Sequence, residues 1–491
     1  MINSTEKLRL ALVLPPFVFS GFRDTGMKQS LPFLGVAYLA ANVDMKRVDV
    51  RIYDCAALGM RLKRLLSEFA RFQPHVVGLS APTFKIIDAH ETARAVKKML
   101  PGVVAIAGGD HATAVPVETL ERFPMFDFVV YGEGEKTLNE LIKRFLEDGA
   151  GADFAGVQGI CYRENGVIRE MPPMPYIEDI DSLAFPAFHL MPVHKYNGVF
   201  TFMMLKRRTL TLSTGRGCIY NCVFCNKTIG GKYRYRSTAS VIEEAQRDIR
   251  DFLTQEFYIT DESFLSNREH AWGFCEEYMR KGLHRRAKWV CFSRVDETDP
   301  DMLKLMKRAG CRLISYGIES GNEEVLEIIK KEISLEQAIN TVRWTKEAGI
   351  IASTNFIIGL PGDTCETIRD TINFAFKADA QMASFQIMVP FPGTEAMSMA
   401  RKSEGGLRLL TEDYTKYCKQ VGGAHELETV SRSELERLQR NAWVRFYLRP
   451  SKFYYLLMYV DMKMLVLFGW HTVITKLKNL IRKDNANNKP A

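Results

Sequence analysis

The chain has 491 residues, 46% hydrophobic and 25% charged, a balance typical of globular proteins large enough for two or three domains. Lysine and arginine (66 residues) exceed aspartate and glutamate (58 residues) by 8, a small excess that does not indicate nucleic-acid binding. No apolar stretch followed by a cleavage site stands at the amino terminus, so we expect a cytoplasmic protein.

The first third of the chain alternates short apolar runs with amphipathic stretches, from residue 8 to about residue 147. The apolar runs predict strands at residues 8–14, 48–53, 75–80, 103–107 and 126–131. Helical spacing covers residues 34–43, 61–72, 89–100, 117–122 and 137–145. This alternation predicts an α/β fold with a Rossmann-like, doubly wound parallel sheet in a domain of residues 1–148.

Turn residues gather where the predicted strands end, which is the edge at which doubly wound sheets bind ligands. Ser80 and Thr83 follow the third strand, and Gly108-Gly109 follows the fourth. A Gly-Glu-Gly-Glu run at 132–135 follows the fifth strand. Because glycine has no Cβ, the glycine pair would let a large ligand approach the backbone closely.

Residues 149–208 are expected to form a connector, with a hairpin-like stretch around Asn165-Gly166. Next come Cys218, Cys222 and Cys225, spaced C-x3-C-x2-C in one loop. Three thiolates can converge on one metal centre and leave a coordination position open. Structural zinc usually has four ligands in two pairs, and no second pair stands in the sequence, so an iron-sulfur cluster is favoured over zinc and over a chance spacing.

The cysteine spacing, with Phe224 before the third cysteine, resembles the signature of the radical S-adenosylmethionine (SAM) superfamily. The resemblance implies that the three thiolates hold a 4Fe-4S cluster, whose fourth iron is chelated by the methionine part of SAM. An electron from the reduced cluster would then cleave the sulfonium bond, giving methionine and a 5′-deoxyadenosyl radical. Phe224 would lie near the adenine.

Strand and helix patterns alternate about six times behind the cysteine loop, with strands expected at 210–214, 256–260, 288–293, 313–318, 352–358 and 383–389. This is consistent with the partial TIM-like barrel of six strands that the resemblance implies for residues 209–400, where function concentrates at the carboxyl ends of strands. The implied SAM-binding residues are Asp261, Glu262, Ser293, Arg294 and Glu319. A helix cap or an exposed polar group is the alternative for each side chain.

The N-terminal turns resemble the cobalamin-binding domain that precedes the radical SAM core in many enzymes. Asp54 and Gly59 match the cobalamin motif D-x-H-x-x-G, but Ala56 replaces its cobalt-coordinating histidine. The resemblance therefore implies cobalamin held without a histidine ligand from this motif, or, as the alternative, a Rossmann-like domain without a cofactor. The implied cobalamin-binding residues are Asp54, Gly59, Ser80, Thr83, Gly108, Gly109, Glu133 and Gly134.

Residues 401–491 are expected to form a helical, aromatic and basic region. Its apolar stretch at 453–470 contains Asp461 and Lys463, which argue against a membrane-spanning helix. The stretch predicts either a helix that covers the barrel or an interfacial helix that places residues 453–483 on a membrane surface. The second interpretation would make the protein peripheral to the membrane.

Together, the resemblances predict a cobalamin-dependent radical SAM enzyme. The leading hypothesis is a C-methyltransferase acting on an unactivated carbon of a hydrophobic or natural-product-like small molecule, with an electron donor such as flavodoxin or ferredoxin. A non-methylating enzyme similar to the anaerobic magnesium-protoporphyrin monomethyl ester cyclase is the first alternative. A methylthiotransferase would need additional cluster cysteines, and a non-enzymatic electron-transfer or sensor protein would need a fourth cluster ligand.

Overall fold

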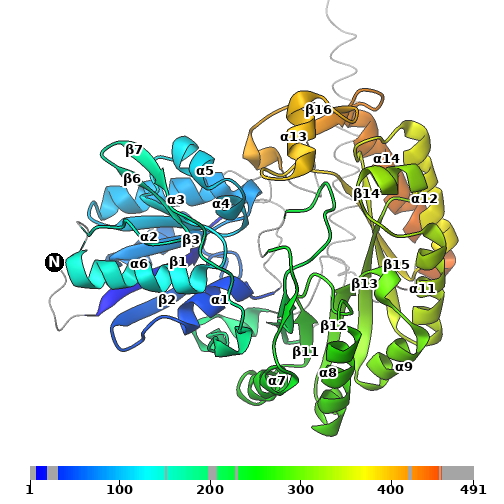
Figure 1. Ribbon diagram of the computed structural model, residues 1–491, viewed down its shortest axis with the longest axis horizontal. Coiled ribbons are helices and arrows are strands. Elements are labelled where there is room, and N and C mark those ends of the chain that lie inside the picture. The colour runs from blue at the N-terminus through cyan, green and yellow to red at the C-terminus, as the bar shows by residue number, and fades with distance from the viewer. Residues whose placement is uncertain are drawn as a thin grey trace, which may run out of the picture.

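A computed structural model describes residues 7–18, 31–149, 152–196, 207–226, 230–417, 423–452 and 455. Two large sheets, one from each half of the chain, stand side by side, and loops of the second half lie between them (Figure 1). The α/β fold class expected from the sequence is confirmed, with parallel strands dominating both sheets.

The N-terminal sheet has the strand order β2-β1-β3-β4-β5-β6-β7. Its parallel strands are β1 (Leu8–Leu14), β2 (Val48–Asp54), β3 (Val76–Ser80), β4 (Val104–Gly108) and β5 (Phe128–Val130). Helices cover both faces, which explains why the leucine-rich β1 is almost wholly buried (Figure 1). The strand order reverses between β1 and β3, and doubly wound sheets bind ligands at the carboxyl ends near such a switch.

The connections of this sheet are α1 (Leu34–Ala41), α2 (Leu62–Phe72), η1 (Thr83–Lys85), α3 (Ile86–Met99), α4 (Asp110–Ala114), α5 (Pro116–Arg122) and α6 (Gly134–Asp148). The hairpin expected around Asn165-Gly166 is β6 (Ile160–Glu164) and β7 (Val167–Glu170), and both turn residues have the positive φ that a tight hairpin needs. Because β6 pairs with β5, part of the expected connector extends the N-terminal sheet.

The second sheet is fully parallel, in the order β15-β14-β13-β12-β11-β8. Its strands are β8 (Thr209–Leu212), β11 (Glu256–Ile259), β12 (Lys288–Ser293), β13 (Cys311–Glu319), β14 (Ile351–Ile358) and β15 (Met382–Ile387). The helices outside it are α7 (Thr238–Phe252), α8 (Arg268–Arg280), α9 (Pro300–Arg308), α10 (Glu323–Ile328), α11 (Leu335–Glu347) and α12 (Cys365–Ala378). Burial alternates strictly along β14, so one face packs under helices while the other lines a more open interior.

The last part of the barrel half includes α13 (Glu395–Lys402), β16 (Leu407–Leu409), η8 (Tyr414–Lys416), β17 (His425–Leu427) and α14 (Arg432–Tyr447). Helix α14 packs beside the edge strand β15 (Figure 1). The hydroxyl of Tyr447 donates to Ala383 O (2.8 Å) and accepts from Ala383 N (3.1 Å), while Trp443 Nε1 donates to Phe385 O (3.0 Å). Side chains of one helix thus satisfy backbone groups that an edge strand would otherwise expose.

Segment η8 returns to the N-terminal half. Tyr414 and Tyr417 are fully buried in the same hydrophobic cluster as β1, β3 and β4 residues. Among the described residues, no helix has the length and apolar character needed to cross a membrane. The stretch 453–483 expected to reach a membrane surface lies outside the described residues, except for Tyr455.

Candidate functional site

A short hairpin presents the cysteine loop, a name used here for residues 217–226 and 230–233. Its strands, β9 (Gly215–Arg216) and β10 (Arg234–Tyr235), pair in antiparallel register. Cys218 N donates to Gly230 O at 3.4 Å, and a Cβ on Gly217 would lie 2.1 Å from Lys232 O. Gly217 has φ +96°, so the closed base of the loop requires glycine for its backbone angle and for its lack of a side chain.

None of the three cysteines on this loop forms a disulfide bond. Cys218 and Cys222 are half-buried, whereas Cys225 is exposed. The Tyr233 hydroxyl donates to Cys218 Sγ at 3.9 Å, and the Cys222 thiol donates to Lys330 O at 3.7 Å. Within the described ranges, no three His, Cys, Asp or Glu side chains are grouped closely enough to hold a metal ion. To hold one cluster together, the three cysteine side chains would have to turn from these positions.

Charged side chains surround Cys222. Burial raises the pKa of its thiol, the Lys331 charge lowers it, the Glu319 charge raises it, and Arg294 lowers it again. Lys331 Nζ lies 3.1 Å from Glu319 Oε1, with both side chains largely buried. A donor set of three thiols next to two cations fits an iron-sulfur cluster, whose thiolates need compensating positive charge.

Backbone strain marks the segments beside Cys222. Glu319, the last residue of β13, has φ +71°, and the register with β14 shifts at this point. Lys330 and Glu332 on either side of Lys331 also have positive φ. Non-glycine residues are held in this region only where the surroundings fix them, as is common at functional sites. The Lys331–Glu319 pair is therefore held by a strained backbone, and the sequence motifs did not point to Lys331.

Arg294, expected to meet SAM, already has several partners. Its guanidinium binds the Asp296 carboxylate through two contacts (2.9 and 3.0 Å) and donates to Lys331 O (2.9 Å). It also lies 3.4 Å from the ring centroid of Tyr220, which is part of the cysteine loop. These contacts hold the loop against the carboxyl end of β12.

Asp261 and Glu262 follow β11 but face different surroundings. The buried Asp261 carboxylate accepts from Thr214 N (2.8 Å) and from the Thr214 hydroxyl, and burial raises its pKa to about 6. Glu262 remains open to solvent on one side. Crowding by protein atoms raises its pKa, the backbone N–H groups of Glu262 and Gly217 lower it, and the neighbouring Asp261 raises it. Glu262 thus offers an accessible carboxylate at the base of the cysteine loop.

Ser293 and Phe224 occupy less open positions. Ser293 is buried, with its hydroxyl 3.4 Å from Ser263 Oγ. Phe224 is half-buried and packs against the barrel core. Its neighbour Val223 donates to Ile329 O (3.1 Å) and accepts from Ala396 N (3.0 Å), which pins the middle of the loop to the barrel.

The Asp54 motif at the end of β2 is partly internal. Asp54 is fully buried, with Oδ1 accepting from Ala57 N (2.9 Å) and Oδ2 accepting from the Tyr196 hydroxyl (2.8 Å). Gly59 has φ +57°, and a Cβ there would meet nothing within 4 Å. The aspartate therefore shapes the turn, whereas the glycine leaves open space at the ligand edge of the sheet.

Four of the implied cobalamin-binding residues lie at or just after the carboxyl ends of β3 and β4: Ser80, Thr83, Gly108 and Gly109. A Cβ on Gly109, which has φ +91°, would lie 2.9 Å from Ser80 Oγ and 3.1 Å from Ala81 N. The glycine is thus needed for close packing of the two loops, while Gly108 has only a distant backbone neighbour at 3.8 Å. The Thr83 hydroxyl lies 3.2 Å from His111 Nδ1.

His111 points into the protein. It is fully buried beside the Tyr414 ring (centroids 4.8 Å apart), and burial lowers its pKa to about 4. Ala56 replaces the motif histidine, and His111 is turned inward, so neither position presents an imidazole at this edge. The open backbone at Gly59 and Gly132 fits a large flat ligand such as a corrin held without a histidine from this motif.

Glu133 and Gly134 follow β5. Both oxygens of Glu133 are engaged by the arginines of the β9/β10 hairpin: Oε1 lies 2.9 Å from Arg216, and Oε2 lies 2.8 Å from Arg234. A Cβ on Gly134 would lie 3.1 Å from Leu39 of α1. Sequence motifs missed the two arginines, although Arg216 directly precedes Gly217-Cys218.

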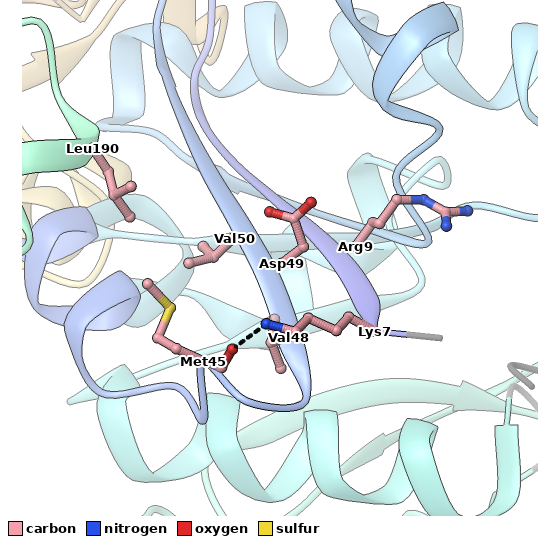
Figure 2. Close-up of a pocket in the computed structure, with 7 residues that line it drawn as sticks. All are labelled: Lys7, Arg9, Met45, Val48, Asp49, Val50 and Leu190. Carbon is pink, nitrogen blue, oxygen red and sulfur yellow. Dashed lines mark hydrogen bonds between the residues drawn. The ribbon is translucent and has the colours of Figure 1, made fainter. Parts of the chain in front are cut away.

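A separate hollow of about 460 Å³ opens at the amino ends of β1 and β2. Figure 2 shows Lys7 donating to Met45 O across it, with Asp49 and Val50 beside them. The hollow lies at the amino ends of the strands, whereas the turns that carry the implied cobalamin-binding residues follow their carboxyl ends. It is therefore not part of the candidate site.

Comparisons with known proteins assign a family description to each of the two parts of the chain. A family described as "Radical SAM superfamily" matches residues 212–375, and one described as "B12 binding domain" matches residues 27–142. An uncharacterized methyltransferase of Pyrococcus horikoshii is 34% identical over 90% of this chain and 93% of its own length. The anaerobic magnesium-protoporphyrin IX monomethyl ester cyclase of Cereibacter sphaeroides is 27% identical over 91% and 72% of the two chains.

Among solved structures, the radical S-adenosylmethionine methyltransferase TsrM from Kitasatospora setae, with cobalamin and a [4Fe-4S] cluster bound, has the same fold. Its TM-score is 0.67 at 19% identity, over 88% of this chain and 91% of that chain.

Proposed function

Because the chain belongs to the radical SAM superfamily and carries a B12-binding domain, we propose that it is a cobalamin-dependent C-methyltransferase acting on a small hydrophobic molecule. The observation that carries the proposal is that the carboxyl edges of the two sheets meet. Glu133 after β5 binds Arg216 beside the cysteine loop. A second contact joins the loop after β15 to the end of α4. A Cβ on Gly393 of that loop would lie only 2.9 Å from Ala114 O, the carbonyl of the last residue of α4.

The proposed sites follow from these positions. Cys218, Cys222 and Cys225 would hold the cluster, and the glycine-lined edge at Gly59 and Gly132 would hold cobalamin. When bound, the cluster supplies one electron for SAM cleavage and cobalamin carries the methyl group.

This chain's own residues divide into two groups. The exposed carboxylate of Glu262 follows β11, where it could accept from the SAM ammonium. Glu319 ends β13 beside Lys331, at the position that resembles the superfamily's ribose contact. Asp261 and Arg294 instead hold the chain on either side of the cysteine loop, through Thr214 and Tyr220. We therefore assign SAM contact to the first pair and positioning to the second.

We also propose that a flavodoxin or ferredoxin donates the electron. Cys225 and Ile219 are exposed on the cysteine loop, with Ile219 51% exposed, so a small redox protein could approach the cluster there. Contact of residues 453–483 with a membrane surface also remains a proposal.

Anaerobic reconstitution with iron, sulfide and hydroxocobalamin, followed by SAM and a chemical reductant, tests the function. We expect S-adenosylhomocysteine in amounts that require the added cobalamin, together with 5′-deoxyadenosine. Deoxyadenosine without S-adenosylhomocysteine would instead favour a non-methylating reaction, for which the similarity to the cyclase is the specific support. Absence of both products would refute a radical SAM activity.

A further inference from the structure

The Gly-Glu-Gly-Glu run forms a buried clamp on the hairpin that carries the cysteine loop. Arg216 and Arg234 are direct partners across the antiparallel β9/β10 pair. Glu133 bridges them, with one carboxylate oxygen on each guanidinium (2.9 and 2.8 Å). Glu135 adds a second carboxylate to Arg216 at 2.8 Å. All four side chains are at most 10% exposed.

Charge explains why the bridge matters. Two like charges directly opposite each other on paired strands repel, and water cannot screen them in a buried position. Burial alone would raise the pKa of Glu133, but its bonds to Arg234, Ile177 N and Arg216 lower it, so the carboxylate stays charged. Without that charge, the two guanidiniums would push apart the strands that close the base of the cysteine loop.

The same clamp touches the proposed cobalamin edge. Glu133 lies three residues after the end of β5, and its neighbour Gly132 donates from its backbone N–H to Thr113 Oγ1 (3.2 Å) in α4. Helix α4 in turn follows Gly108-Gly109 at the end of β4. A continuous set of contacts therefore runs from the loops at the ligand edge of the N-terminal sheet to Arg216, one residue before Gly217 and two before Cys218.

We propose that Glu133 and Glu135 are positioning residues that couple ligand binding on the N-terminal sheet to the ordering of the cysteine loop. The coupling rests on the proposed function only in taking cobalamin as the ligand. Because coupling between two binding equilibria is reciprocal, an assembled cluster should tighten cobalamin binding by the same factor by which bound cobalamin tightens cluster binding.

Hydrogen exchange on the full chain without cofactors tests the clamp itself. Glu133→Gln should speed amide exchange in peptides covering residues 217–226 by about tenfold or more, since it removes the one negative charge that the two buried guanidiniums share. Glu135→Gln, which removes one contact of the four-residue set, should have a smaller effect. The matched control is Glu256→Gln, which breaks another buried ion pair, Glu256–Arg312, located at the amino end of β11. Equal exchange in Glu133→Gln and Glu256→Gln would overturn the clamp.

Hydroxocobalamin affinity tests the coupling. In the wild-type chain we expect the dissociation constant to be at least ~5-fold lower with the cluster reconstituted than without it. Glu256→Gln should keep this ratio, and Glu133→Gln should bring it close to one. A ratio of one in the wild type, or an unchanged ratio in Glu133→Gln, would overturn the coupling. Failure of both wild-type forms to bind cobalamin would refute the proposed function and the coupling with it, while the exchange experiment would still decide the clamp.

Discussion

Replacing Gly217 by alanine directly perturbs the base of the cysteine loop. The new Cβ would lie 2.1 Å from Lys232 O, a backbone atom just before β10. The neighbouring pairing of β9 with β10 holds that oxygen, so the clash is relieved only if the strands separate. The substitution should therefore open the loop rather than cause a local side-chain adjustment.

The expected magnitude has two parts. An alanine in the left-handed region that Gly217 occupies costs about 1–2 kcal/mol. Opening the hairpin also strains the bonds from Glu133 to Arg216 and Arg234, and hydrogen bonds to charged groups contribute ~1.5–3 kcal/mol each. A combined loss of about 3 kcal/mol or more in the free energy of loop opening raises the open population at least ~100-fold.

Iron and sulfide content after anaerobic reconstitution, and hydrogen exchange of peptides covering residues 217–226, measure this effect. Gly217→Ala should hold much less cluster than the wild type and exchange faster in the loop. Gly231→Ala is the matched control, because a Cβ at that position meets nothing within 4 Å and its φ is not in the left-handed region. If Gly217→Ala keeps the wild-type iron content and exchange rate, the loop base is not closed as described.

Three further predictions concern the cluster, pH dependence and the contact between the two halves. Cys218→Ala should abolish cluster absorbance and deoxyadenosine formation, and persistence of both would refute the cluster assignment. Burial lowers the pKa of His111 from 6.5 to about 4, so as the pH falls the unfolded chain takes up a proton on this imidazole before the folded chain does. The free energy of unfolding should therefore be highest above pH 6.5 and fall towards pH 4, with a loss of ~2 kcal/mol at pH 5. His111→Asn should reduce this acid-side loss in thermal unfolding, whereas the exposed His189→Asn should not. Tyr414→Phe should lower the free energy of unfolding by ~1.5–3 kcal/mol in urea titrations, because the Tyr414 hydroxyl donates to the Glu118 carboxylate. Tyr417→Phe should lower it by only ~1 kcal/mol, because the Tyr417 hydroxyl donates to a backbone carbonyl. Equal losses in the two variants would contradict this assignment.

The fold followed from local patterns in the sequence. Each βαβ unit places its strand and helix signals within a short stretch of chain, so β1 and most of the barrel strands could be located by periodicity. The radical SAM and B12-binding resemblances, and the cofactors that they implied, are confirmed by the family matches. The individual SAM and cobalamin contacts stay predictions.

Contacts between distant segments could not be predicted in the same way. Glu133 meets Arg216 across 83 positions, and no local pattern distinguishes a glutamate that will face a ligand from one that will face an arginine. The two-residue strands β9 and β10 are too short for any periodicity to appear. No sequence pattern indicated Lys331 either, because only the backbone angles reveal the positive φ of its neighbours Lys330 and Glu332.

The return of η8 to the N-terminal half has a consequence for how the chain is made. Tyr414 reaches Glu118 across 296 positions, and its ring completes the packing around His111. Domains generally begin to fold as they leave the ribosome, amino terminus first. The surface around His111 in the nascent N-terminal domain therefore stays uncovered until residues 414–417 have been translated. We expect ribosome-stalled chains that end before residue 407 to be held by chaperones or cleaved by proteases at this surface.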